Sequence, residues 1–339
     1  MPDPTTPNLW ELADLCTPWC VHVVATLRVA DHLDAGITRI DDLAAACGAH
    51  ADSLHRVLRH LVQKEIFAEP SPGVFALNDL ARGLIGESGR IGFDLDGIGG
   101  RMAHAWGSLL TAVRTGAPAY HEVFGRPFWD DLEANPSVAA SFDALMGHVG
   151  HGTPDPEILV NNDWDDVHTV VDVGGGTGAT IAEILRARPH VRGILVDLPG
   201  PISRSRDVLL AAGVAIGDRG TADRITTVAQ SFFDPLPPGG DVYLVKNVLA
   251  DWPDREARAL LSRCADAARS RNGRVVVLGG VAPDGPGGGP HPALLMMVLV
   301  GGRERTLTEF RELARAAGLT VSATGRQPTG RFVVECRTI

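Results

Sequence analysis

The chain has 339 residues, of which 45% are hydrophobic and 21% are charged. This composition excludes a largely disordered protein, and the length suits two domains of ordinary size. The net charge of −10 argues against a protein whose main partner is nucleic acid, and no apolar run approaches the ~20 residues of a membrane span. The first residues lack the basic and apolar segments of a secretory signal, so we expect a cytoplasmic protein without a membrane partner.

Residues 1–85 have the pattern of several helices followed by a small hairpin. Leu54, Leu58 and Leu61 recur at helical spacing, and FAEPSPGVFALND (67–79) alternates around a turn, which favours a two-stranded wing. Helices followed by a wing are typical of winged-helix domains, many of which bind DNA. The segment holds eleven acidic and only six basic residues, whereas a DNA-reading surface needs a basic excess. We therefore interpret it as a packing or dimerisation module.

The cysteines of the chain show no metal-binding or disulfide pattern. Their number is odd and no C-x2-C pair occurs, so the sequence indicates neither a zinc site nor a disulfide framework, and we expect no metal. Cys16 and Cys20 lie one helical turn apart, and we interpret them as two small buried hydrophobic residues.

Residues 86–163 are predicted to be helical and connective, with a helix that starts at Asn135 or Pro136. From Thr169 onward, short buried strands alternate with helices, which favours a doubly wound, mostly parallel sheet in an α/β domain. The predicted strands lie within 169–173, 193–199, 223–233, 241–249, 273–281 and 331–337. The predicted helices lie within 179–189, 256–270 and 307–319.

A glycine-rich turn follows the first of these strands. Gly174, Gly176 and Gly178 allow a sharp bend and let a ligand reach main-chain N–H groups at the start of a helix. Asp197 ends the next strand, where its carboxylate can accept hydrogen bonds from two ribose hydroxyls, and we expect it to have little structural role. These features predict a ribose-bearing cofactor at the carboxyl edge of the sheet. Ala179 also completes the G-x-G-x-x-A fingerprint of dinucleotide-binding proteins, so a nicotinamide oxidoreductase stays open.

An ordered set of motifs carries a resemblance to a known family. The motifs are VDVGGGTG (171–178), VDLP (196–199), QSFFDPLP (230–237), LVKNVLADWPD (244–254) and GGRERTLTEFRELARAAG (301–318). With this set the chain resembles the plant-type small-molecule O-methyltransferases, which use S-adenosylmethionine. It is most similar to bacterial members that methylate naphthoates and anthracyclines in antibiotic pathways. The resemblance covers nearly the whole chain, because the amino-terminal part matches the dimerisation domain of that family.

The resemblance implies a domain organisation and an assembly. A helical winged-helix dimerisation domain would span residues 1–100, connecting helices that contribute to the substrate pocket would span 101–163, and a Rossmann-like methyltransferase domain would span 164–339. It further implies a homodimer that acts in secondary metabolism on a small, aromatic substrate.

The resemblance also assigns roles to single residues. Gly174 and Gly176 would line the methionine end of the cofactor, Asp197 would hold its ribose, and Phe232 or Phe233 would pack near its adenine. The other expected cofactor-binding residues are Leu198, Ser231, Lys246, Trp252 and Met146. Met146 has an equal claim to be an ordinary core residue.

The chain departs from the family pattern where the chemistry is done. Ser231 stands where the family has an aspartate before the adenine element, and Ala250 stands where it has the histidine that serves as general base. Gly279 aligns with a supporting glutamate, whereas the second supporting acid is retained as Glu304. The cofactor-binding residues therefore look intact while the proton-removing pair is missing.

Methyl transfer from a sulfonium can proceed without a base at position 250. Much of the rate comes from holding the nucleophile near the methyl group, whereas a general base adds about 100- to 10,000-fold. The base is dispensable if the acceptor is an ionised phenol, an amine or an activated carbon. A displaced histidine could also replace it, and His148, His151 and His291 are the candidates.

The leading hypothesis is a methyltransferase that acts on oxygen, with nitrogen or carbon as alternatives. A methyltransferase-like enzyme that catalyses hydroxylation, decarboxylation or cyclisation is the second hypothesis, because of Ala250. A winged-helix regulator that senses S-adenosylmethionine is the third, and the nicotinamide oxidoreductase is the last.

Overall fold

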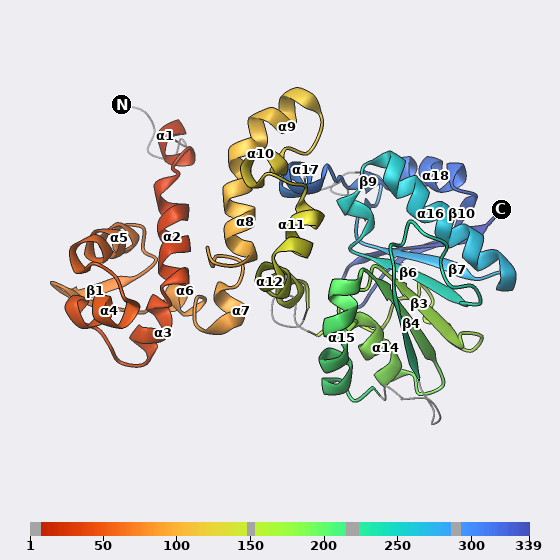
Figure 1. Ribbon diagram of the computed structural model, residues 1–339, viewed down its shortest axis with the longest axis horizontal. Helices are drawn as coiled ribbons and strands as arrows, with labels where there is room; N and C mark the ends of the chain where they lie inside the picture. Colours follow the sequence, from red (N-terminus) through yellow and green to blue (C-terminus); the bar gives the residue numbers. More distant parts are fainter. Residues whose placement is uncertain (1–7, 148–152, 215–223, 286–292) are drawn as a thin grey trace. The chain divides into compact units, whose positions relative to one another are not determined.

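The computed structural model describes residues 8–147, 153–214, 224–285 and 293–339. The chain divides into two compact units, which are described separately below (Figure 1). The first unit comprises residues 1–104 and 140–150, and the second comprises 105–139 and 151–339. The predicted boundaries at 100 and 163 stay a prediction. Within the described ranges, every helix is too short or too polar to cross a lipid bilayer.

The first unit is a helical domain with a small hairpin. Its helices are α1 (Leu9–Leu12), α2 (Cys16–Thr26), α3 (Val29–Asp34), α4 (Ile40–Cys47), α5 (Ala51–Gln63), α6 (Asp79–Arg82), α7 (Gly86–Arg90) and α8 (Ile98–Ala105). Strands β1 (Ala68–Ser71) and β2 (Val74–Ala76) form the predicted antiparallel wing.

The core of the first unit is built around α5. Its residues Leu54, Leu58 and Leu61 are buried together with Phe67 and Phe75, which flank and form the wing. The leucine spacing therefore identified the buried face of α5 correctly, because apolar residues three and four positions apart share one side of a helix.

The second unit contains a seven-stranded sheet in the order β10-β11-β7-β6-β3-β4-β5. Its strands are β3 (Thr169–Val173), β4 (Arg192–Asp197), β5 (Ile225–Ala229), β6 (Val242–Lys246), β7 (Arg274–Leu278), β10 (Leu319–Arg326) and β11 (Phe332–Thr338). The strands from β7 to β5 are parallel to one another, whereas β11 runs antiparallel to both β7 and β10. The predicted α/β fold with a mostly parallel sheet is confirmed.

Helices cover both faces of the sheet (Figure 1). One face packs against α14 (Ala179–Ala187) and α15 (Pro199–Ala211), and the other packs against α16 (Asp254–Ala268) and α18 (Leu307–Ala316). Successive valines of one strand alternate between these two cores, since Val275 and Val277 belong to one and Val276 belongs to the other. This alternation explains why the strands are continuously apolar in the sequence.

Three strands were not predicted. Strand β10 lies at the edge of the sheet, and its residues alternate between buried or half-buried and exposed positions, with serine, threonine and glycine among them. Such a sequence lacks the apolar run of a buried strand. Strands β8 (Val281–Ala282) and β9 (Arg305–Thr306) form a two-residue parallel pair that is too short to leave a sequence pattern.

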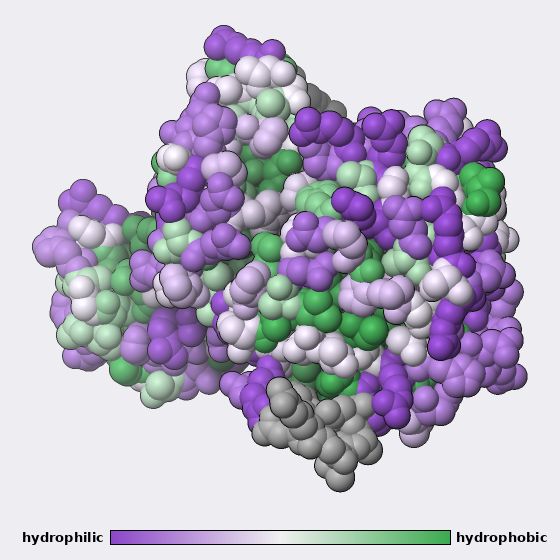
Figure 2. Space-filling view, turned by 45° about the vertical axis from the view of Figure 1, so that its right-hand side comes forward, coloured by the Kyte–Doolittle hydropathy of each residue, from purple (hydrophilic) through white to green (hydrophobic). Residues whose placement is uncertain are grey.

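The remaining helical segments lie in the connecting part of the chain and in the loops of the α/β domain. They are η1 (Trp106–Ser108), α9 (Leu109–Thr115), α10 (Tyr120–Phe124), α11 (Phe128–Ala134), α12 (Pro136–Met146), η2 (Leu249–Asp251), η3 (Arg269–Arg271) and α17 (Leu294–Val300). The start of α12 at Pro136 agrees with the sequence prediction. On the face presented in Figure 2, hydrophilic side chains cover most of the surface and hydrophobic side chains gather in separate patches.

A buried arginine holds the loop that follows β6. The side chain of Arg305, on β9, is only 1% exposed, and its Nη2 donates to the carbonyl oxygen of Trp252 at 2.8 Å. Its Nη1 donates to the carbonyl oxygen of Leu249 at 3.2 Å, and its Nε donates to Asp254 Oδ1 at 2.9 Å. One guanidinium therefore fixes both ends of the segment 249–254, using the planar fork of donors that only arginine offers.

We expect Arg305→Lys to lower the free energy of unfolding by about 2–3 kcal/mol, because a single ammonium cannot replace these bonds and leaves buried carbonyls without donors. Urea unfolding followed by circular dichroism measures the loss. The matched control is Arg303→Lys, a half-exposed arginine two residues earlier, which should change stability by no more than about 0.5 kcal/mol. Equal losses in the two variants would contradict the role assigned to Arg305.

Candidate functional site

The glycine turn between β3 and α14 has the backbone that the sequence predicted. Gly174, Gly176 and Gly178 all have positive φ angles, of 71°, 61° and 87°. A Cβ on Gly174 would lie 2.8 Å from Val248 Cγ2, whereas a Cβ on Gly176 would meet none of the described residues within 4 Å. The turn is therefore packed on the protein side at Gly174 and open at Gly176, which leaves backbone accessible to a ligand.

Asp197 is tied to this turn. Its Oδ2 accepts a hydrogen bond from the Gly176 amide at 2.7 Å, and its Oδ1 accepts one from the Leu198 amide at 2.7 Å. The two residues meet because β3 and β4 are neighbouring parallel strands whose carboxyl ends are in register. The expectation that Asp197 has little structural role is therefore wrong, because its carboxylate also holds the loop.

A buried acid and a half-buried lysine lie at the ends of neighbouring strands next to the turn. Asp172, on β3, is fully buried, and this burial raises the pKa of its carboxyl to about 7, although the charge of Lys246 opposes the shift. Burial also lowers the pKa of Lys246, whose Nζ donates to Thr180 Oγ1 at 2.9 Å at the start of α14. The expected contact of Lys246 with the cofactor stays a prediction, and the structure adds its link to the helix behind the turn.

Asp172 was not among the predicted site residues. A Cβ on Gly175 would lie 2.5 Å from Asp172 Oδ2, so this middle glycine of the motif is required for space. Among the described residues, Asp172 Oδ2 has no hydrogen-bond partner. An acid inside an otherwise apolar strand was the signal in the sequence, because a buried carboxyl is rare without a function.

The predicted aromatic residues form one cluster. The ring centroids of Phe232 and Phe233 lie 5.8 and 5.0 Å from that of Trp252, and Trp129 stacks on Trp252 at 6.2 Å. A Cβ on Gly174 would lie 3.3 Å from Phe232, so the cluster adjoins the glycine turn. Trp129, on α11, was missed because its segment gave only a connective pattern. Together the rings make an apolar wall suited to a flat ligand.

The side chain of Ser231 stabilises the turn in which it lies. Its Oγ accepts a hydrogen bond from the Phe233 amide at 3.2 Å. This bond fixes the backbone that carries both phenylalanines. The role of Ser231 toward the cofactor stays a prediction.

Ala250 lies in η2, packed against two glycines. A Cβ on Gly280 would lie 3.2 Å from Ala250 Cβ, and a Cβ on Gly302 would lie 2.0 Å from the Ala250 carbonyl oxygen. Gly279 has a φ of +83°, and a Cβ there would lie 2.7 Å from Asn247 Oδ1. A glutamate at position 279 would therefore be strained in this backbone. Positions 250 and 279 thus hold small residues that are closely packed.

Two acids belong to the segments that meet around Ala250. Asp251 follows Ala250, and burial raises the pKa of its carboxyl to about 7. Glu304 is half-buried and lies between Gly302 and Arg305, which contact the segment 249–254. Sequence reasoning missed Asp251, although its place beside Ala250 in the DW element was a usable signal.

Some predicted residues lie in the first unit or outside the described residues. Met146 ends α12 in the first unit and is 45% exposed, so its interpretation as a core residue is wrong, and its role at the cofactor stays a prediction. His148, His151 and His291 lie outside the described residues. Cys16 is exposed and Cys20 half-buried, which corrects the interpretation of both as buried hydrophobic residues.

Comparison with known proteins identifies the family. Residues 106–320 match the model of the O-methyltransferase domain, and residues 10–87 match that of the O-methyltransferase dimerisation domain. The 2,7-dihydroxy-5-methyl-1-naphthoate 7-O-methyltransferase of Streptomyces carzinostaticus is 42% identical over 93% of this chain and 93% of that protein. The aclacinomycin 10-hydroxylase of Streptomyces purpurascens is 37% identical over 93% of this chain and 84% of that protein.

A solved structure is similar over the whole chain. It is an O-methyltransferase from neocarzinostatin biosynthesis in complex with S-adenosylmethionine and 2-hydroxy-5-methyl naphthoic acid, with a TM-score of 0.87 and 38% identity over 99% of this chain and 100% of that chain. The expected enzyme class and cofactor are confirmed. The chain belongs to the family of O-methyltransferases with an amino-terminal dimerisation domain, and it is a methyltransferase that uses S-adenosylmethionine.

Proposed function

We propose that this enzyme methylates a hydroxyl group of a small aromatic secondary metabolite and that it does so without a histidine base at position 250. The observation that supports this proposal most directly is the hydrogen bond from the Gly176 amide to Asp197. It holds a carboxylate next to a turn with open backbone at one edge of the sheet. The named activity of the naphthoate relative and the naphthoic acid bound by the solved neighbour support an aromatic acceptor.

The residues at the site suit S-adenosylmethionine. Asp197 places a carboxylate at the strand end where a ribose diol would bind, Gly176 has open space beside its backbone, and Phe232 and Phe233 offer aromatic surface for an adenine. The cofactor supplies an electrophilic methyl group on a sulfonium. What the chain contributes is the orientation of cofactor and acceptor and the exclusion of water around them.

The acceptor hydroxyl must lose its proton to a proton acceptor during the reaction. Ala250 offers none, and Gly279 cannot support a neighbouring base. We propose that the acceptor reacts in its ionised form, as an acidic phenol does near neutral pH. Asp251 is the ionisable residue next to Ala250, and since the pKa of its carboxyl is raised to about 7, it is protonated below that pH and charged above it.

A second candidate is a methyltransferase-like enzyme that adds oxygen instead of a methyl group. The observation that favours it is the 37% identity to a protein named a hydroxylase, together with Ala250. The mass of the product separates the two reactions. Methylation replaces a hydrogen by a methyl group, a net gain of CH2, whereas hydroxylation, which would need molecular oxygen and a two-electron reductant, adds one oxygen atom.

The enzyme is further proposed to be a homodimer. On α1, Leu9, Trp10 and Leu12 are 76%, 86% and 72% exposed in the single chain, although all three are apolar. The second unit exposes Trp106, Leu110 and Val113 at helical spacing. Exposed apolar surface of this kind indicates an interface, and the match to the dimerisation domain supports a second copy of the chain as its partner.

For the cofactor site, we expect Asp197→Ala to lower the affinity for S-adenosylmethionine about 10- to 100-fold, because charge-assisted hydrogen bonds to the ribose are lost. Isothermal calorimetry measures the affinity, and circular dichroism checks that the variant is folded. Asp207→Ala, which removes an exposed acid from α15, is the matched control and should bind normally. Unchanged affinity in folded Asp197→Ala would remove the assignment.

To test whether a base acts at position 250, kcat/KM is measured as a function of pH. We expect it to rise as the acceptor hydroxyl ionises, without the additional ionisation step (limb) at about pH 6–7 that a histidine base would give. Ala250→His should change the rate by much less than the 100- to 10,000-fold that a general base adds, and crowding against Gly280 should slow it. A limb near pH 7 that disappears in Asp251→Asn would instead assign the proton to that carboxyl. A limb that disappears in His148→Ala, His151→Ala or His291→Ala would assign it to a displaced histidine.

For the assembly, we expect a dimer at micromolar concentration by light scattering. The double variant Trp10→Ala and Leu12→Ala should dissociate at a concentration at least about tenfold higher than the wild type, because it removes two exposed apolar side chains that a partner would bury. Ile339→Ala, which truncates an exposed apolar residue at the other end of the chain, is the control. A monomeric wild type would contradict the proposal.

A further inference from the structure

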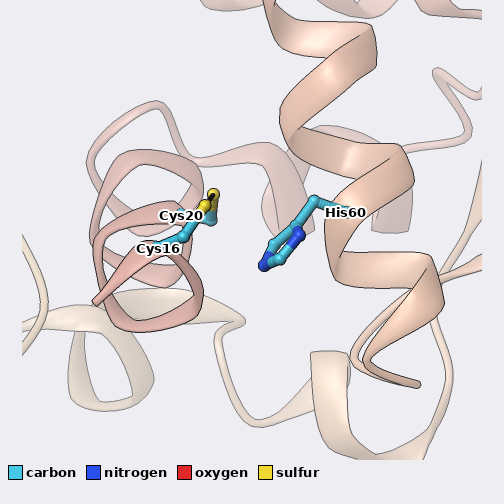
Figure 3. Close-up of side chains that lie close together, drawn as sticks. All are labelled: Cys16, Cys20 and His60. Carbon is cyan, nitrogen blue, oxygen red and sulfur yellow. Dashed lines mark hydrogen bonds between the residues drawn. The ribbon is translucent and has the colours of Figure 1, made fainter. Parts of the chain in front are cut away.

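Two cysteines and a histidine come together in the first unit, whereas the glycine turn and Asp197 belong to the second (Figure 3). Cys16 and Cys20 lie one turn apart on α2, and their sulfur atoms are 3.9 Å from each other. His60 is on α5, and Figure 3 shows its imidazole between that helix and the two cysteines. One ligand atom from each of the three residues lies within 4.8 Å of the others.

The spacing of the sulfur atoms fits a single tetrahedral ion. Two thiolates about 2.3 Å from a tetrahedral zinc ion lie about 3.8 Å apart. The observed 3.9 Å meets this value without movement of the backbone. Two thiolates and an imidazole are soft and borderline ligands, which select zinc and similar ions and disfavour magnesium and calcium.

The surroundings orient the histidine. Thr17 Oγ1 lies 2.8 Å from His60 Nε2, and the Thr17 hydroxyl also donates to the Asp14 carboxylate. Asp14 Oδ1 in turn accepts from the Cys16 amide at 2.8 Å. The imidazole and the start of α2 are thus connected through one threonine and one carboxylate. A hydrogen-bonded chain that ends in a carboxylate behind a histidine is the usual support of a metal ligand.

We propose that Cys16, Cys20 and His60 bind one zinc-class divalent ion, with a water molecule in the fourth position, and that the ion joins α2 to α5. The exposure of Cys16 gives an ion access from solvent. All three ligands lie within the part of the chain that matches the dimerisation domain, so the expected role is structural. The sequence concealed the site because the third ligand comes from another helix and the two cysteines do not form a C-x2-C pair.

The test uses the full-length protein, reduced and freed of metal with a chelator. Cobalt(II) is titrated as the spectroscopic probe, and zinc(II) then competes for the site. We expect one cobalt per chain, with a thiolate-to-cobalt charge-transfer band and the intense visible bands of tetrahedral coordination. Zinc should abolish both. Cys16→Ser, Cys20→Ser and His60→Gln should each weaken zinc binding at least about tenfold, and Thr17→Val should weaken it about 10- to 100-fold.

Cys47→Ser is the matched control, because Cys47 is a half-buried cysteine of the same unit that lies outside the cluster. It should bind as the wild type does. Zinc should also raise the thermal midpoint of the wild type and of Cys47→Ser but not that of His60→Gln, whose metal-free form should melt like metal-free wild type. Absence of thiolate bands, binding that survives Cys20→Ser, or equal losses in Cys47→Ser would each overturn the proposal. None of these measurements depends on methyl transfer.

Discussion

The hydrogen bond from the Gly176 amide to the Asp197 carboxylate is the constraint on which the rest of the site depends. It joins the turn after β3 to the end of β4, so the two loops that would enclose a cofactor cannot separate without breaking a charge-assisted bond. The bond exists because parallel neighbouring strands end at the same edge of the sheet. The open face of Gly176, the aromatic wall beside Gly174 and the loop after β6 all adjoin this joined edge.

Beneath that edge lie two ionisable side chains of opposite charge, Asp172 and Lys246. Asp172 is buried and Lys246 is half-buried, and each draws the other toward its charged form against the cost of burial. Thr180 gives the ammonium a hydrogen-bond acceptor at the start of α14. The turn therefore lies on a polar support inside an otherwise apolar sheet, which holds its shape while its upper surface stays free for a ligand.

The parts of the structure that could be predicted are those that the sequence marks by regularly spaced apolar residues or by turn residues. Six strands of the large sheet, the wing and the buried face of α5 followed from apolar spacing and turn residues. The cofactor edge followed from glycines and an acid at strand ends. Contacts between segments far apart in the chain left no such pattern. Arg305 on the 249–254 segment, Trp129 on Trp252, and His60 beside Cys16 and Cys20 are of this kind.

The hydrogen bonds from Arg305 to the segment 249–254 affect which substitutions this segment can accept. Apart from Asp254, the guanidinium bonds main-chain oxygens, so it recognises the path of the segment and not the side chains at positions 250 and 251. The loop therefore keeps its course whichever residue occupies those positions, within the space that Gly280 and Gly302 leave. A substitution at position 250 or 251 therefore need not disturb the path of the main chain. In this loop the side chains can vary while the backbone scaffold is kept.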